Sequence, residues 1–386
     1  MPMLDAHIPG RAAAGGRGQA PRAAGRLLEH EEVDRANQGR PNGITVRSAW
    51  RHPKQPFNGE GARNRRYGDT AGWWPGKNYP ADIYPGLVRL VSLLPSATEI
   101  VYALGLGGDL VGVTFECDEP AAARLEKEIV VGGRDTSGMT PAEIDSYVRD
   151  RLASGADLYT LHADALARLR PDLILTQDLC RVCALPSGHV TEALEFLGCR
   201  ADVLSLDPYT LDEVLDTIVA VGERTRVTDR AEQVVAGLRS RLARVAARVA
   251  GRPRPRTAIV EWADPPFAAG HWIPDLVTVA GGEPVAARPG QRSEPIAWQE
   301  IAAAGPDVII VAPCGYHLAG AVSQAVVATA ALAGVPVWAI DADSLVVRPG
   351  PRLIDGVEAI AAILHPGAVP DPPGGQIALV HSPPGR

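Results

Sequence analysis

Hydrophobic positions recur most regularly between residues 229 and 250. Apolar side chains follow one another there at spacings of four, four, three and four, at Val234, Leu238, Leu242, Val245 and Val249. This spacing places them on one face of a helix, and Arg239, Arg241, Arg244 and Arg248 fall between them. Asp229 stands where a helix N-cap belongs, and Gly251 where a helix ends. We therefore predict one helix, roughly 33 Å long, which can span two lobes.

Two similar segments flank this helix. Residues 169–180 read Leu-Arg-Pro-Asp-Leu-Ile-Leu-Thr-Gln-Asp-Leu-Cys, and residues 304–314 read Ala-Gly-Pro-Asp-Val-Ile-Ile-Val-Ala-Pro-Cys. Each predicts a helix end, a Pro-Asp turn, a short aliphatic strand and a polar loop with a cysteine. Strands that alternate with helices favour parallel sheets, in which ligands bind beyond the carboxyl ends of the strands.

The predicted fold is therefore α/β, with two Rossmann-like lobes whose parallel sheets are joined by one long spine helix, and with a ligand cleft between the lobes. The predicted divisions are a disordered or wrongly started extension at 1–86, a first lobe at 87–228, the spine helix at 229–251, a second lobe at 252–366 and a disordered tail at 367–386. Capping boxes at Thr140 with Glu143, and at Thr210 with Glu213, are expected to begin two helices of the first lobe.

Composition narrows the compartment and the partners. Hydrophobic residues make up 46% of the 386 residues, and no apolar run is long enough to span a membrane. Residues 1–86 carry 13 Lys or Arg and 8 Asp or Glu, so the remaining chain carries a net charge of −12 and is not expected to bind nucleic acid. No secretory signal is recognised. This predicts a cytoplasmic protein with reduced thiols, or a periplasmic or extracellular-face one if the assigned start is wrong.

Five short segments together resemble a known family. They are residues 92–99, 170–174, 264–270, 280–283 and 348–352, which read SLLPSATE, RPDLI, DPPFAAG, AGGE and RPGPR. In order and spacing they resemble the helical-backbone (class III) solute-binding proteins of ABC importers for cobalamin, siderophores and haem. The cobalamin-binding branch is the most similar. The resemblance covers about residues 87–366 and implies two rigid lobes, a spine helix and a ligand held between the lobes.

The resemblance also implies roles for individual residues. Phe267 and Arg348 match residues that contact cobalamin, and Asp164 matches an acidic residue that docks on the transporter. The second docking carboxylate falls on Gln299, with Glu300 beside it. The aromatic platforms of the family fall on small or aliphatic residues here, at Gly132 or Gly133, Ser293 and Leu345. Three residues of one loop could replace these platforms, namely Trp262, His271 and Trp272.

The cysteines suggest a second kind of site. Cys117, Cys180, Cys183 and Cys314 each follow a predicted strand, so the fold could bring them to one cleft. Cys180 and Cys183 have the spacing at which two thiolates bind one tetrahedral metal ion or form a redox disulfide. A zinc or iron–sulfur site is one interpretation, although a second such pair is missing. The other is that these are small, weakly polar residues that pack in the core or line a pocket.

We therefore hypothesise a non-enzymatic protein that binds cobalamin or a related metal-bearing macrocycle, such as a corrinoid, haem or siderophore, for uptake through an ABC importer or for handling inside the cell. Trp262, Pro266, Phe267 and Trp272 would contact the ligand, and Arg348 would meet its amide or carboxylate groups. His271 could be an axial ligand of cobalt or haem iron, or a structural histidine. The alternative is an intracellular zinc or iron–sulfur enzyme or sensor that uses the cysteines. Phosphate-loop and serine-hydrolase motifs are not recognised.

Overall fold

The structure is a computed structural model that describes residues 88–134, 136, 138–154, 156–179, 187–197 and 200–383. The first lobe is built on a six-stranded sheet with the strand order β4-β3-β2-β1-β5-β6. Its strands are β1 Leu90–Ser92, β2 Leu110–Thr114, β3 Glu128–Gly133, β4 Tyr159–Leu161, β5 Leu173–Thr176 and β6 Asp202–Ser205. Its helices are α1 Pro95–Ala103, α2 Ala121–Glu126, α3 Pro141–Ala153, α4 Ala163–Leu169, α5 Ser187–Leu197 and α6 Leu211–Arg224. All pairings are parallel except that of β3 with β4.

The second lobe is built on a seven-stranded sheet with the order β10-β8-β7-β11-β12-β13, and β9 pairs with β7. Its strands are β7 Arg256–Ala263, β8 Pro266–Ala268, β9 Glu283–Pro284, β10 Glu294–Pro295, β11 Val308–Val311, β12 Val337–Ile340 and β13 Ile377–His381. Its helices are α8 Ile273–Val279, α9 Trp298–Ala303, α10 Leu318–Ala331, α11 Ala342–Leu345 and α12 Leu353–Leu364. Strands β7, β9, β11 and β12 are parallel, whereas β8, β10 and β13 join the sheet antiparallel.

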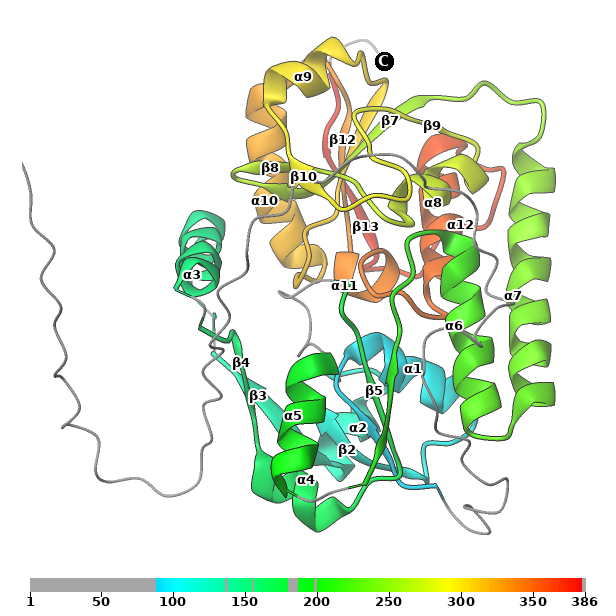
Figure 1. Cartoon of the computed structure of the whole chain (residues 1–386). Coiled ribbons are helices and arrows are strands. Elements are labelled where there is room, and N and C mark those ends of the chain that lie inside the picture. Colours follow the sequence, from blue (N-terminus) through cyan, green and yellow to red (C-terminus); the bar gives the residue numbers. More distant parts are fainter. Residues whose placement is uncertain are drawn as a thin grey trace, which may run out of the picture. The chain divides into compact units, whose positions relative to one another are not determined.

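The predicted spine helix is present as α7, Thr228–Val249. Its buried face includes Leu238 and Val245 and packs on α6 of the first lobe and on α8 and α12 of the second lobe (Figure 1). Asp229 is not the N-cap, because the helix begins one residue earlier and Val227 caps it without a side-chain hydrogen bond. Asp229 instead lies in the first turn, where a carboxylate is favoured by the helix dipole.

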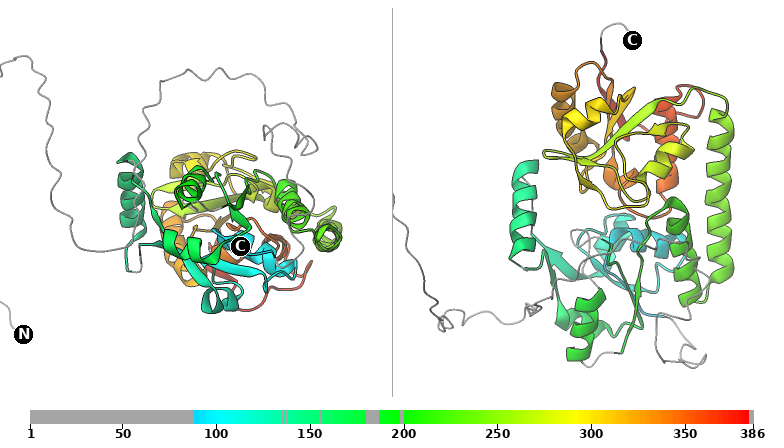
Figure 2. Two further views of the ribbon diagram at one scale, coloured as in Figure 1. Left: turned by 60° about the horizontal axis from the view of Figure 1, so that its bottom comes forward. Right: turned by 45° about the horizontal axis from the view of Figure 1, so that its top comes forward.

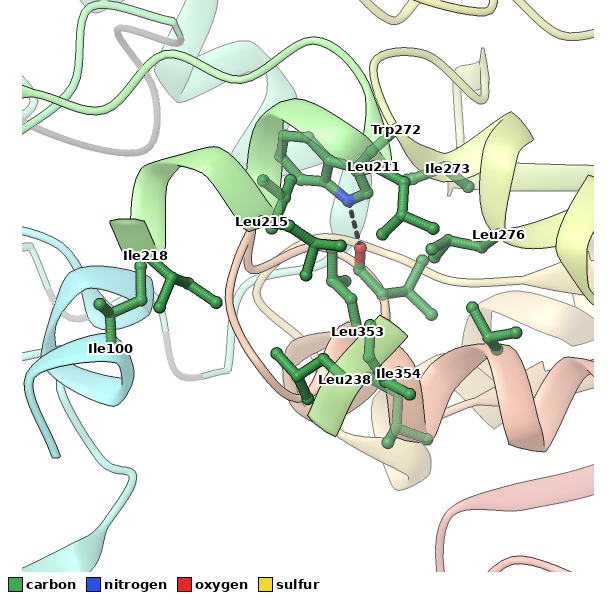
Figure 3. Packing of buried hydrophobic residues seen from close by; sticks show 14 of the residues in the cluster. Ile100, Leu211, Leu215, Ile218, Leu238, Trp272, Ile273, Leu276, Leu353 and Ile354 are labelled. Atoms are coloured by element: carbon green, nitrogen blue, oxygen red, sulfur yellow. Dashed lines mark hydrogen bonds between the residues drawn. The ribbon is translucent and has the colours of Figure 1, made fainter. Parts of the chain in front are cut away.

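One apolar core runs through both lobes. It joins Ile100 of α1 and Leu215 of α6 to Leu276 of α8 and Ile354 of α12, with Leu238 of α7 packed among them (Figure 3). All five side chains are at most 8% exposed. Because the cluster is continuous, the contact between the lobes is part of the folded core rather than a loose domain interface.

The C-terminal segment differs from the expectation. The tail is expected from the sequence to be disordered from residue 367, but Ile377–His381 forms β13 and pairs with β12. The apolar run Ile-Ala-Leu-Val supplies a strand that satisfies the otherwise open edge of β12. The extension at 1–86 lies outside the described residues.

Both predicted capping boxes are present. The hydroxyl of Thr140 accepts a hydrogen bond from the backbone N–H of Glu143, and the Glu143 carboxylate accepts one from the backbone N–H of Thr140. Thr210 and Glu213 make the same pair of bonds at the start of α6. A four-residue pattern is therefore sufficient to predict these two helix starts.

Candidate ligand-binding site

Arg348 connects the two lobes. Its Nη1 lies 2.5 Å from Oδ1 of Asp118, which follows β2 in the first lobe. Its Nη2 lies 3.2 Å from Oδ2 of Asp343, which belongs to α11 of the second lobe. Glu99 of α1 is next, with Oε1 at 3.8 Å from Nη1. One guanidinium therefore holds together loops at the carboxyl ends of strands from both sheets.

The same cluster contains two further basic side chains. Nη1 of Arg352 lies 3.5 Å from Oε1 of Glu99 and 3.9 Å from Oε2 of Glu119. The ring of His317 bridges the lobes, with Nδ1 at 3.1 Å from Asp341 and Nε2 at 3.5 Å from Asp118. Burial alone would lower the pKa of His317, but the hydrogen bond and charge of Asp341 raise it overall. We call this set the interlobe cluster; it comprises Glu99, Glu116, Asp118, Glu119, His317, Asp341, Asp343, Arg348 and Arg352.

Burial changes the charge of the interlobe cluster. It raises the pKa of Glu99 and of Glu116 to about 7, and repulsion from Asp343 adds to the effect on Glu116. Burial likewise raises the pKa of Asp343, against the opposing charge of Arg348. Burial would also raise the pKa of Asp118, but the hydrogen bond and charge of Arg348 lower it overall. The cluster thus holds ionised carboxylates together with two glutamic acids that titrate near neutral pH.

Aromatic rings stand on both sides of this cluster. In the first lobe Phe115 and Tyr159 have ring centroids 6.4 Å apart with planes tilted by 48°. In the second lobe Trp262 and Tyr316 are 5.6 Å apart and tilted by 56°. Phe267 lies opposite Trp262 in the β7–β8 register. Each of these rings is partly exposed, so each lobe offers aromatic surface beside the carboxylates.

Three of these rings were not predicted from the sequence to be ligand contacts. Phe115 directly follows β2, and the hydroxyl of Tyr159 donates a hydrogen bond to Oε1 of Glu116 over 3.4 Å. The strand end before Phe115 was a usable signal, because loops at carboxyl ends of parallel strands form ligand sites. Tyr159 lies on an antiparallel strand, β4, that no pattern indicated. Tyr316 stands two residues after Cys314, and its ring was not among the predicted ligand contacts.

Of two further expected ligand contacts, one is packed in the core and the other is half-buried. Trp272, expected at the ligand, is a core residue, 5% exposed, whose Nε1 donates to the carbonyl oxygen of Val346 over 2.9 Å (Figure 3). The ring of His271 packs between Tyr209 and Trp272, at centroid distances of 5.6 and 5.5 Å. Burial, followed by the charge of Arg292, lowers the pKa of His271 to about 4. The half-buried ring of His271 is therefore neutral at neutral pH and lies against two aromatic rings.

The remaining expected contacts lie closer to the cluster. Trp262 and Phe267 belong to the aromatic surface described above, and Pro266 pairs with Ala263 at the start of β8. Arg348 is only 13% exposed at its side chain, because Asp118 and Asp343 already occupy both of its terminal nitrogens. A ligand could bond only to those guanidinium N–H groups that are not already bonded to these carboxylates.

The two described cysteines stand in different surroundings. Cys117 is fully buried with its Sγ 3.0 Å from the hydroxyl of Thr98, and burial raises the pKa of its thiol to about 12. Cys314 is exposed, while Cys180 and Cys183 lie outside the described residues. Within the described ranges, His, Cys, Asp and Glu side chains do not form a group of three or more that could hold a metal ion.

The two candidate docking carboxylates lie at helix starts. Asp164 is exposed in the first turn of α4, and Glu300 is exposed in the first turn of α9. Each therefore presents negative charge on the surface of a different lobe. Docking itself stays a prediction.

A family model described as periplasmic binding protein matches residues 90–339. The chain belongs to the periplasmic binding protein family. The predicted resemblance to helical-backbone solute-binding proteins is thereby confirmed. Among the helices of the described part of this binding protein, none is both long and apolar enough to cross a membrane.

Individual relatives of this binding protein agree with the match. The vitamin B12-binding protein of Vibrio cholerae serotype O1 is 27% identical over 295 residues, which cover 75% of this chain and 91% of that protein. An uncharacterized ABC transporter substrate-binding lipoprotein of Bacillus subtilis is 25% identical over 289 residues, covering 72% of this chain and 80% of the relative.

Solved structures share its two-lobe fold. A periplasmic heme-binding protein from Pseudomonas aeruginosa superposes with a TM-score of 0.57 at 24% identity, covering 77% of this chain and 99% of the other. The periplasmic vitamin B12-binding protein of Vibrio cholerae gives a TM-score of 0.50 at 24% identity, with 72% and 96% covered.

Proposed function

We propose that this periplasmic binding protein is the non-enzymatic substrate-binding component of an ABC importer, and that it holds cobalamin or a related corrinoid between its lobes. The main observation in support of this proposal is the interlobe cluster with partly exposed aromatic rings on both sides. The relatives named as a vitamin B12-binding protein and as a substrate-binding lipoprotein support the ligand class and the importer.

Shape favours a flat, conjugated ligand. Phe115 and Tyr159 come from the first lobe, whereas Trp262, Phe267 and Tyr316 come from the second. Aromatic faces contribute large contact areas at a small entropic cost, and they pack against other ring systems. A macrocycle held between the lobes would gain such contacts from both sides. The cleft that would receive it stays part of the proposal.

Charge favours amides over carboxylates on that ligand. Asp118, Glu119, Asp341 and Asp343 outnumber the two arginines of the cluster, and both arginines are already paired. The rim of a corrin carries amide groups, whose N–H groups can donate to carboxylates. The two propionates of haem would instead meet excess negative charge. We therefore place corrinoids ahead of haem and of anionic siderophores.

The same relatives support a compartment for the proposed function. Their names describe periplasmic proteins and a lipoprotein, which supports action outside the cytoplasmic membrane rather than the cytoplasmic location expected first. Neither the relatives nor the described cysteines support the zinc or iron–sulfur alternative.

Calorimetric titration tests the proposal directly. The purified full chain should bind cyanocobalamin with a Kd in the micromolar range or tighter and should bind haem more weakly. Trp262→Ala and Phe267→Ala should each weaken cyanocobalamin binding roughly tenfold, since one aromatic pair is worth about 0.5–1.5 kcal/mol beyond its buried area. Leu379→Ala is the control, because that side chain is 50% exposed on β13. Absence of cyanocobalamin binding, or a clear preference for haem, would overturn the assignment.

A further inference from the structure

Helix α3 stands apart from the packing of the first lobe. It has 13 residues, yet none of its side chains is buried. It makes no extensive contact with another helix or strand of the described part of the chain. Most helices in proteins owe their stability to packing an apolar face, and a helix of this length is marginal alone in water. We therefore expect α3 to have a binding partner that covers one of its faces.

One face of α3 is suited to an apolar partner. Ile144, Tyr147 and Val148 follow the helical spacing of three and four residues, and all three are partly exposed. The opposite face carries Ser146 and Asp150, which are exposed. The guanidinium of the residue that follows β3, Arg134, lies 4.6 Å from the centroid of the Tyr147 ring and orients it.

The two ends of α3 are fixed. At the N-terminus the capping box of Thr140 and Glu143 satisfies backbone N–H groups. At the C-terminus the guanidinium of Arg151 donates to the backbone carbonyl of Asp157. These bonds favour a helix that is already formed in the free protein, so that its apolar face need not be ordered on binding.

Strands β3 and β4 connect α3 to the proposed ligand site. The helix is inserted between β3 and β4, and Gly133 at the end of β3 pairs with Tyr159. A Cβ atom at Gly133 would lie 2.7 Å from the Phe115 ring, so the strand end packs directly against the Phe115–Tyr159 pair. From there α3 extends toward the second lobe, on the side of β8 and β10 (Figures 1 and 2). Strand β8 carries Phe267.

We propose that α3 is a wall of the ligand site, whose Ile144, Tyr147 and Val148 face contacts the ligand beyond the aromatic rings and limits its size. This inference rests on the proposed function. The occupant is the apolar edge of a macrocycle rather than another protein, because α3 follows β3 in the chain and the last residue of β3, Gly133, packs against the Phe115–Tyr159 pair. The half-exposed side chains would become buried only when the site is filled.

A triple variant of this face tests the proposal. Ile144→Ser, Tyr147→Ser and Val148→Ser combined should weaken cyanocobalamin binding roughly 30-fold, since three apolar side chains lose contact area with the ligand. The matched control replaces three exposed positions of the same helix, Ala142→Ser, Ser146→Ala and Ala153→Ser, and should bind like the wild type. Circular dichroism of both variants checks that α3 and the lobes remain folded.

Hydrogen exchange gives a second readout on the unaltered chain. Amides of residues 141–153 should exchange more slowly with saturating cyanocobalamin, while those of α10 should not change. A conservative pair, Ile144→Leu with Val148→Leu, should keep wild-type affinity because the face stays apolar. A triple variant that binds as tightly as the wild type, or unchanged exchange in α3, overturns the inference while leaving the proposed function intact. An altered oligomeric state of the triple variant, with unchanged ligand affinity, would identify a second copy as the occupant instead.

If the wild-type chain binds no cyanocobalamin at all, the proposed function fails first and the role of α3 fails with it. Weaker binding by Trp262→Ala alongside normal binding by the triple variant separates the two ideas. In that case the aromatic site is correct and α3 lies outside it.

Discussion

The pKa of Glu99 makes a sharp prediction about stability. Its side chain is 4% exposed, and Oε2 is buried without a hydrogen-bond partner among the described residues. Burial raises the pKa from 4.5 to about 7, although the charges of Arg352 and Arg348 oppose the rise. The folded protein therefore binds this proton more tightly than the unfolded chain does. The perturbation that tests this is Glu99→Gln, which keeps the shape and removes the titration.

The sign and size follow from proton linkage. A raised folded-state pKa gives stability that is fully present below pH 4.5 and is lost as the pH rises through about 7. Each tenfold difference in proton affinity is worth about 1.4 kcal/mol, so the whole loss is roughly 3 kcal/mol. Most of it falls between pH 5 and pH 8. The Glu99→Gln side chain has no proton to lose and should remove this part of the pH dependence. An unsatisfied amide would lower stability by a similar amount at every pH.

Urea unfolding followed by circular dichroism at pH 5 and pH 8 is the assay. The wild type should lose about 2–3 kcal/mol more stability than Glu99→Gln between the two pH values. Glu232→Gln is the control, because that exposed carboxylate of α7 is not among the charges that act on Glu99. Equal pH dependence in the wild type and Glu99→Gln would refute the reasoning, since Glu99 would then titrate alike in the folded and unfolded states.

Four further substitutions probe other parts of the fold by urea unfolding. Arg348→Met should cost about 2–3 kcal/mol, because it leaves carboxylates of both lobes without their shared cation; a loss below about 0.5 kcal/mol would show that the connection is unimportant. Gly356→Ala should cost more than about 2 kcal/mol, because its Cβ would collide with the carbonyl oxygen of Leu345, whereas Gly237→Ala, with open space in α7, should stabilise by about 0.5–1 kcal/mol. Equal effects of the two glycine substitutions would contradict this geometry. Thr210→Ala should cost about 1 kcal/mol through the lost capping bond, and unchanged stability would mean that water replaces the cap.

The sequence allowed most of the fold to be predicted because its signals were local. The apolar stripe of α7 and the two capping boxes depend only on neighbours within one or two helical turns. The antiparallel strands were missed for the opposite reason. Strand β4 has three residues and β10 has two, so neither shows a periodic pattern, and each is defined by the strand it pairs with.

The candidate site was harder to predict because it depends on contacts between distant residues. Arg348 and Asp118 are 230 positions apart, and only the folded chain shows that the arginine is largely occupied. Trp272 looked like its neighbour Trp262 in sequence, but the Val346 carbonyl that receives its N–H comes from a different loop. The importance of Phe115 could have been inferred from its place after β2, whereas the unpacked face of α3 is visible only in three dimensions.

Strand β13 limits how far the chain can be truncated at its C-terminus. A fragment trimmed to residues 90–339, the extent of the family match, would lose the last residue of β12 together with α11, α12 and β13. The edge of β12 would then be bare over Val337, Trp338 and Ala339, with no strand to pair with. Unprotected edges of this kind recruit strands from other molecules. Expression of such a fragment should yield aggregates, whereas recombinant versions that retain Ile377–His381 should stay dispersed.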